Sequence, residues 1–130
     1  MALKSSDCND WPPLSDEEVT GFMPSIPMWE RKEYGSDGLV KLVRSFTCKN
    51  FQVCLDFIQA AGAVAEARGH HPDFHLTGYR NMDVVIFSHS LKAITENDIN
   101  LCRALDEIKV AYSPKWLKDH PTAADSALEE

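Results

Sequence analysis

Apolar residues recur at helical spacing between residues 51 and 68, and this is the clearest pattern in the chain. The stripe consists of Phe51, Cys54, Leu55, Ile58, Ala61 and Ala65. Asn50 can cap the helix, and Gly69 can end it, because glycine enters the left-handed conformation at little cost. The pattern therefore predicts one long helix from residue 51 to 68 whose apolar stripe lies on a sheet.

Two shorter helices are predicted from their capping signals. Ser15 is followed three residues later by Glu18, which is a capping box and starts a helix at about residues 16–22. Thr95 and Asp98 repeat the same arrangement before an apolar period that runs from Ile99 to Ile108. We expect helices at both places.

Four segments have the length and composition of strands. Residues 28–34 and 39–46 flank a turn at residues 35–38 that contains two glycines, and residues 73–77 and 82–88 flank a turn at residues 78–81. The run Val84–Phe87 is continuously apolar and is therefore expected to be central in the sheet. The element order does not alternate as in a Rossmann fold. It favours an α+β domain with a four-stranded antiparallel sheet and helices packed on one face.

The domain is expected to occupy residues 14–112, between a flexible N-terminal arm at residues 1–13 and a C-terminal tail at residues 113–130. Residues 121–130 are acidic and are expected to be frayed.

The charge balance limits the classes of partner. The chain carries 13 basic and 20 acidic residues, a net charge of −7, so it lacks the basic surface that a nucleic-acid backbone requires. No apolar run reaches the roughly 20 residues of a membrane span, and the N-terminus has no hydrophobic signal core. We expect a cytoplasmic protein, with a nuclear or organelle location left open. The four cysteines form no Cys-x-x-Cys pair and are expected to be reduced and structural.

Four of the five histidines lie between Glu66 and His89. His70 and His71 emerge where the long helix ends, and Pro72 fixes the backbone behind them. Imidazoles titrate near neutral pH and can give or take a proton, so a cluster indicates acid–base chemistry or a metal site. The spacing of His71 and His75 could imitate a zinc pair, but Pro72 breaks the helix that would align the two rings. We expect neither a metal nor an organic cofactor.

The residues around this cluster resemble a family signature. Glu66, His70-His71-Pro72, Tyr79, His89 and Asp98 stand at the spacing found in the pterin-4a-carbinolamine dehydratases. The similarity in element order runs from about Leu14 to Ile108. Ser88 stands where the family often has threonine, and the segment between Pro72 and Tyr79 has the longer of the two family lengths.

The resemblance implies a dehydratase that removes water from 4a-hydroxytetrahydropterin (4a-hydroxytetrahydrobiopterin) and returns quinonoid dihydropterin to tetrahydrobiopterin recycling. It implies catalysis by His70, His71 and His89, with Glu66 orienting a ring; which histidine is acid and which is base stays open. The substrate-binding residues implied are Gly69, His70, His71, Phe74, Phe87, Ser88, His89 and Ser90.

Several of these residues also have ordinary explanations. Asp98 stands where a capping acid belongs, and Glu66 is as consistent with a solvated helix face as with a role in the site. Tyr79 is expected to pack at a turn, while His75 and His120 are expected to be ordinary strand and tail residues.

A second class of function follows from the same resemblance, because some members of the family bind a homeodomain transcription factor as a dimerisation cofactor and coactivator. The partners implied are therefore a pterin, further copies of the chain in a homodimer or homotetramer, and in the second case another protein. An exposed apolar helix face would favour the second function.

Overall fold

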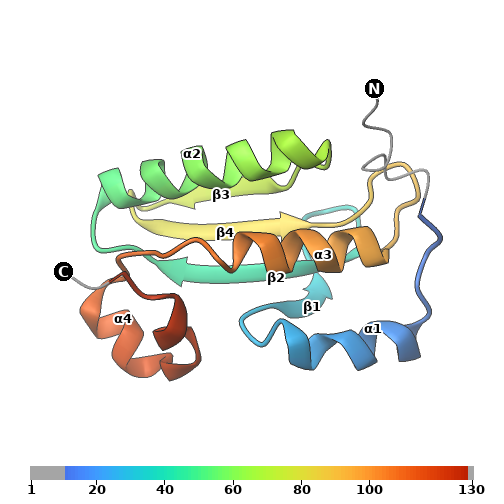
Figure 1. Ribbon diagram of the computed structural model, residues 1–130, viewed down its shortest axis with the longest axis horizontal. Coiled ribbons are helices and arrows are strands. Elements are labelled where there is room, and N and C mark those ends of the chain that lie inside the picture. The colour runs from blue at the N-terminus through green and yellow to red at the C-terminus, as the bar shows by residue number, and fades with distance from the viewer. Residues whose placement is uncertain (1–10, 129–130) are drawn as a thin grey trace.

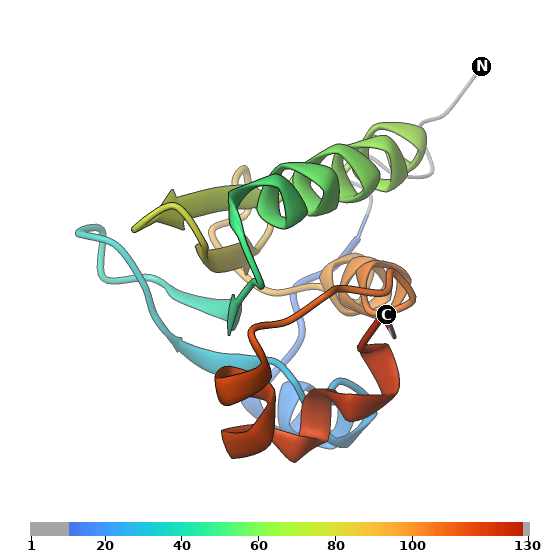
Figure 2. The ribbon, with the colours of Figure 1, turned by 90° about the vertical axis from the view of Figure 1, so that its left-hand side faces the viewer.

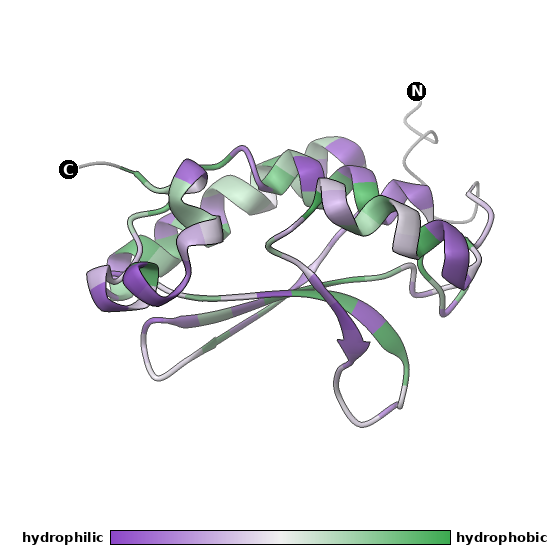
Figure 3. Cartoon of the chain, turned by 90° about the horizontal axis from the view of Figure 1, so that it is seen from below, coloured by the Kyte–Doolittle hydropathy of each residue, from purple (hydrophilic) through white to green (hydrophobic). Residues whose placement is uncertain are grey.

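The computed structural model describes residues 11–128. A four-stranded antiparallel sheet has the order β1-β2-β4-β3, and the helices gather on one of its faces (Figures 1, 2 and 3). The strands are β1 (Glu30–Glu33), β2 (Val40–Thr47), β3 (Asp73–Thr77) and β4 (Asn81–Ile86). The α-helices are α1 (Asp16–Phe22), α2 (Phe51–Arg68), α3 (Glu96–Leu105) and α4 (Pro114–Asp119), and the 3-10 helices are η3 (Met23–Ser25) and η4 (Pro121–Ser126). The predicted α+β fold is confirmed.

The capping residues act as the sequence predicts. Ser15 and Thr95 each form a complete capping box, and the Asn50 side chain accepts a hydrogen bond from the Val53 N–H at 2.9 Å. Gly69 ends α2 with φ of 68°, a left-handed conformation that a residue with a Cβ enters at a cost. Local signals therefore fix where the helices begin and where α2 hands over to β3.

One detail of the predicted α2 stripe is wrong. The buried residues of α2 are Cys54, Phe57, Ala61 and Ala65, whereas Phe51 and Leu55 are 47% and 38% exposed. Phe57 packs edge-on against Phe46 of β2 with ring centroids 5.1 Å apart. The seam lies along Cys54, Ala61 and Ala65, and the bulky Phe57 fills the space beside these small residues.

The C-terminal segment is folded where fraying was expected. Residues 121–126 form η4, and both Ala123 and Ser126 are buried. The Tyr112 hydroxyl lies 2.6 Å from the Ser126 hydroxyl and accepts a hydrogen bond from the buried Arg44 guanidinium at 2.6 Å. The expectation of a frayed segment is wrong for residues 121–126, because buried polar contacts hold it on the core. Residues 1–10 and 129–130 lie outside the described residues, and the proposed limits of arm, domain and tail stay a prediction.

The fold can be compared with two expectations from the sequence, that the cysteines are structural and that no segment spans a membrane. Cys48, Cys54 and Cys102 are buried free thiols, as expected for structural cysteines, while Cys8 lies outside the described residues. Within residues 11–128, every helix is too short or too polar to cross a membrane.

We predict that Phe57→Ala lowers the free energy of unfolding by about 3–5 kcal/mol, because it removes a buried ring from the seam between α2 and the sheet. Urea unfolding followed by circular dichroism measures the loss. Leu55→Ala, on the exposed side of the same helix, is the matched control and should cost less than about 1 kcal/mol. Equal losses for the two variants would contradict the observed orientation of α2.

Candidate functional site

Four elements meet at one end of the sheet. The C-terminus of α2, the start of β3, the end of β4 and the N-terminus of α3 lie together at the right-hand end in Figure 1. The left-handed Gly69 turns the chain out of α2, and the His70 N–H still donates to the Ala65 carbonyl at 3.2 Å. This turn brings His70 and His71 to the end of the sheet, from which the chain enters β3.

His70 is buried and is held by a carboxylate. Its side chain is 5% exposed, and its Nε2 lies 2.5 Å from Oδ1 of Asp98, which is fully buried. Oδ2 of Asp98 accepts hydrogen bonds from the Thr95 N–H at 2.7 Å and from the Ser88 hydroxyl at 2.9 Å. Because a carboxylate only accepts, Nε2 of His70 donates this hydrogen bond, and Nδ1 lies on the other side of the ring.

Asp98 therefore has two roles at once. The capping role predicted from the sequence is confirmed by its contacts with Thr95. The contact with His70 is the addition that the structure makes, and it joins the start of α3 to the end of α2. The Ser88 hydroxyl is buried and directed to Asp98.

His71 is an exposed neighbour of the buried His70. Its side chain is 62% exposed, and its Nε2 lies 3.0 Å from Oε1 of Glu66, which is 81% exposed. Glu66 lies in the last turn of α2, two residues before its end at Arg68, so its carboxylate reaches the ring across the Gly69 turn. The geometry thus pairs Glu66 with His71.

His89 approaches from the end of β4. Its ring packs against Phe87 with centroids 4.3 Å apart, and its Nε2 lies 4.0 Å from Oδ2 of Asp73, the first residue of β3. The Lys41 ammonium lies 4.5 Å from the centroid of the Phe87 ring. The same ammonium forms an ion pair with Asp37 at 3.0 Å.

Asp73 and Lys41 were missed by sequence reasoning. The only signal for Asp73 was its position directly after Pro72 at the start of a strand that pairs with β4. No signal marked Lys41, because its contact with Phe87 depends on the register between β2 and β4.

The remaining sequence-predicted residues occupy different environments. Phe74 packs edge-on against Phe57 with centroids 6.3 Å apart, so its ring is directed to the helices. Ser90 is exposed, in the turn that follows β4. Tyr79 is 60% exposed in the turn between β3 and β4, so the packing role expected for it is wrong. His75 contacts Tyr34, with ring centroids 5.2 Å apart.

Among residues 11–128, no group of three or more histidine, cysteine, aspartate or glutamate side chains is arranged to hold a metal ion.

The family model for pterin 4 alpha carbinolamine dehydratase matches residues 12–108. The chain belongs to this family. The match contains the whole sheet, α2, α3 and the histidine-bearing end, and leaves out α4 and η4.

Two relatives and one solved structure extend the comparison. The chain is 32% identical over 109 residues to the Arabidopsis thaliana protein named pterin-4-alpha-carbinolamine dehydratase 2, mitochondrial, covering 82% of this chain and 57% of that protein. It is 36% identical over 97 residues to a Methylococcus capsulatus protein provisionally named as such a dehydratase, covering 75% of this chain and 81% of the relative. The crystal structure of a transcriptional coactivator/pterin dehydratase from Brucella melitensis has a TM-score of 0.63 and 28% identity, covering 73% of this chain and 96% of that one. The chain thus spans little more than half the length of the Arabidopsis relative.

We predict that Asp98→Ala lowers the free energy of unfolding by about 2–4 kcal/mol, since it removes a helix cap and leaves buried donors on Ser88 and His70 unpaired. Chemical denaturation measures the loss. Glu96→Ala removes an exposed acid from the first turn of the same helix and should change stability by less than about 0.5 kcal/mol. A loss near zero for Asp98→Ala would refute the role assigned to the carboxylate.

Proposed function

We propose that this protein is a 4a-hydroxytetrahydropterin dehydratase that uses histidines as acid and base. Membership of the family and the names of its relatives support the reaction class. The observation that carries the proposal is the placement of His70, His71 and His89 at one end of the sheet, each next to its own carboxylate.

Dehydration of 4a-hydroxytetrahydropterin requires two proton transfers. The bond between C4a and the hydroxyl oxygen breaks, the oxygen leaves as water with an added proton, and a ring nitrogen gives up a proton as its electrons form the new double bond. One group must donate the first proton and another must accept the second, each contributing roughly 10²–10⁴-fold to the rate. An imidazole titrates near neutral pH, so it can act as the base in its neutral form and as the acid in its protonated form.

The three histidines bring different properties to this chemistry. His70 is held by Asp98 and offers Nδ1 in a fixed orientation. His71 and His89 are exposed, so solvent can restore their protons between turnovers. The pterin would then lie beside Phe87 and the backbone at Gly69, with protons exchanged by the exposed rings. In the proposed mechanism His70 fixes the substrate and shares in the acid–base chemistry through Nδ1, while His71 and His89 also exchange protons with solvent.

We predict that His70→Ala and His89→Ala each lower the dehydration rate at least about tenfold while the protein stays folded. The assay generates 4a-hydroxytetrahydropterin with an aromatic amino-acid hydroxylase and follows quinonoid dihydropterin by absorbance. His75→Ala is the matched control, because this histidine contacts Tyr34 and is not one of the three proposed catalytic histidines. Wild-type dehydration rates in folded His70→Ala and His89→Ala would contradict the proposed mechanism.

A binding role for the helical face is the second candidate. The Brucella structure is described as a transcriptional coactivator as well as a pterin dehydratase, and α2 of this chain exposes Phe51 and Leu55. We propose that this face carries contacts between copies of the chain or with another protein.

The double variant Phe51→Ser, Leu55→Ser is therefore expected to lower the oligomeric state with the dehydration rate per chain retained. Sedimentation velocity measures the first quantity, and the hydroxylase-coupled assay measures the second. An unchanged sedimentation coefficient would exclude this face from self-association.

A further inference from the structure

Strand β1 begins only at Glu30 and leaves the part of the β2 edge beyond Val43 without a partner strand. The pairing of β1 with β2 stops at Glu30, which lies opposite Val43. Further along the same edge, the segment that follows α3 bonds to β2. There the Ser113 N–H donates to the Thr47 carbonyl at 2.9 Å. Between these two places the edge is open at Ser45.

The backbone of Ser45 points into this opening. The Cys48 N–H donates to the Arg80 carbonyl beside β4, whereas the Lys49 N–H donates to the Ala111 carbonyl on the opposite side. Because the polar groups of successive strand residues alternate between the two edges, Ser45 points the same way as Thr47, away from β4. Across residues 11–128, neither the N–H nor the C=O of Ser45 has a hydrogen-bond partner on this edge.

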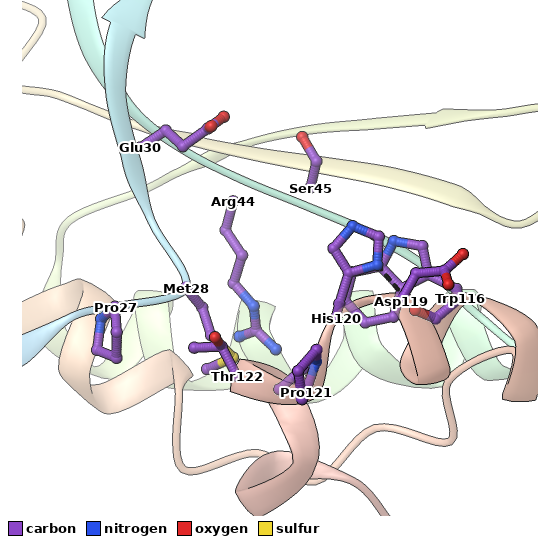
Figure 4. Close-up of a pocket in the computed structure, with 11 residues that line it drawn as sticks. Pro27, Met28, Glu30, Arg44, Ser45, Trp116, Asp119, His120, Pro121 and Thr122 are labelled. Carbon is purple, nitrogen blue, oxygen red and sulfur yellow. Dashed lines mark hydrogen bonds between the residues drawn. The ribbon is translucent and has the colours of Figure 1, made fainter.

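The opening leads into a cavity of about 340 Å³. Figure 4 shows it between the β1–β2 edge and the segment formed by α4 and η4. Its lining includes Met28, Glu30, Arg44, Ser45, Trp116 and His120. Residues of α4 and η4 form one wall of this cavity and are outside the family match at residues 12–108. Figure 1 shows α4 at the end of the sheet opposite to the one where α2 ends and α3 begins.

An aromatic wall of the cavity is held rigidly. The His120 ring stacks on Trp116 with centroids 4.1 Å apart and an interplanar angle of 11°. Its Nδ1 donates to the Trp116 carbonyl at 2.7 Å, which fixes the ring plane. A flat ring can extend this stack, because the His120 side chain is exposed.

The limits of the opening select a compact ligand. A strand added along β2 would have to continue past the places opposite Val43 and Thr47, which Glu30 and Ser113 occupy. A cyclic amide presents its N–H and C=O side by side on one edge, as a single strand residue does, and needs no room on either side. Oε1 of Glu30 lies 3.0 Å from the Lys32 ammonium, and the second carboxylate oxygen can accept from an amino group next to that amide.

We propose that this cavity binds a flat heterocycle with a 2-amino-4-oxopyrimidine edge. The Ser45 N–H donates to the ring carbonyl, the Ser45 C=O accepts from the ring N–H, and Glu30 accepts from the 2-amino group. The ring stacks on His120. Pterins and guanine share this edge, and the site is independent of the dehydratase function proposed for the other end of the sheet.

The first test is a nitrogen–proton NMR titration of the full chain with pterin, guanosine and inosine. Comparing pterin with guanosine shows which of the two heterocycles the cavity binds. Inosine is the control that lacks the 2-amino group. We expect the Ser45 amide and the Trp116 indole signals to shift with pterin, guanosine or both. Inosine should bind at least about tenfold more weakly than guanosine if guanosine binds, because it loses a hydrogen bond to a charged acceptor.

Two variants locate the binding. Ser45→Pro removes the N–H that points into the opening and leaves the ladder with β4 intact, as an edge position allows. His120→Ala removes the stacking ring and leaves the backbone unchanged. This variant therefore tests binding in the cavity even if the proline variant does not fold. Each should weaken binding at least about tenfold, while His120→Ala keeps the wild-type dehydration rate.

The matched control is His89→Ala, which changes the other end of the sheet and should leave the Ser45 shift in place. The proposal is overturned if the shifts fall only around His70 and His89, or if His120→Ala binds as the wild type does. It is also overturned if an N-acetylated tetra-alanine peptide shifts Ser45 while the heterocycles do not, since strand addition would then be the function of the edge.

Discussion

The buried carboxylate of Asp98 is the interaction on which the histidine-bearing end of the molecule depends. An ionised group away from water is costly unless its lone pairs are satisfied, and here both oxygens accept hydrogen bonds. The donors come from His70 after α2, Ser88 after β4 and Thr95 at the start of α3. One carboxylate therefore fixes three chain segments relative to one another, and the orientation of the His70 ring cannot be separated from the way α3 begins.

The parts of the fold that sequence could predict are those with local causes. The capping residue Asn50 and the left-handed Gly69 delimit α2, and the α+β arrangement follows from the order of the elements. The three-residue spacing from Thr95 predicted Asp98 as a cap, and its place in the family signature did not indicate a contact with His70, 28 positions earlier.

The parts that sequence could not predict depend on contacts distant in the chain. Pro114 occupies the first turn of α4 behind the capping side chain of Ser113, a place where its missing N–H does no harm. The segment that follows stays on the core because Tyr112 links Arg44 to Ser126. Such a link joins residues 68 positions apart, and no periodicity reports it.

His70 and His71 are neighbours in the chain, but one is buried and the other is exposed to solvent. The Gly69 turn and the extended backbone after it send one ring into the interior and the next into solvent, with exposed side-chain fractions of 5% and 62%. The boundary between protein and water thus passes through a single peptide bond. A ligand seated across that bond would contact one histidine whose orientation is set by the fold and another whose ring faces the solvent.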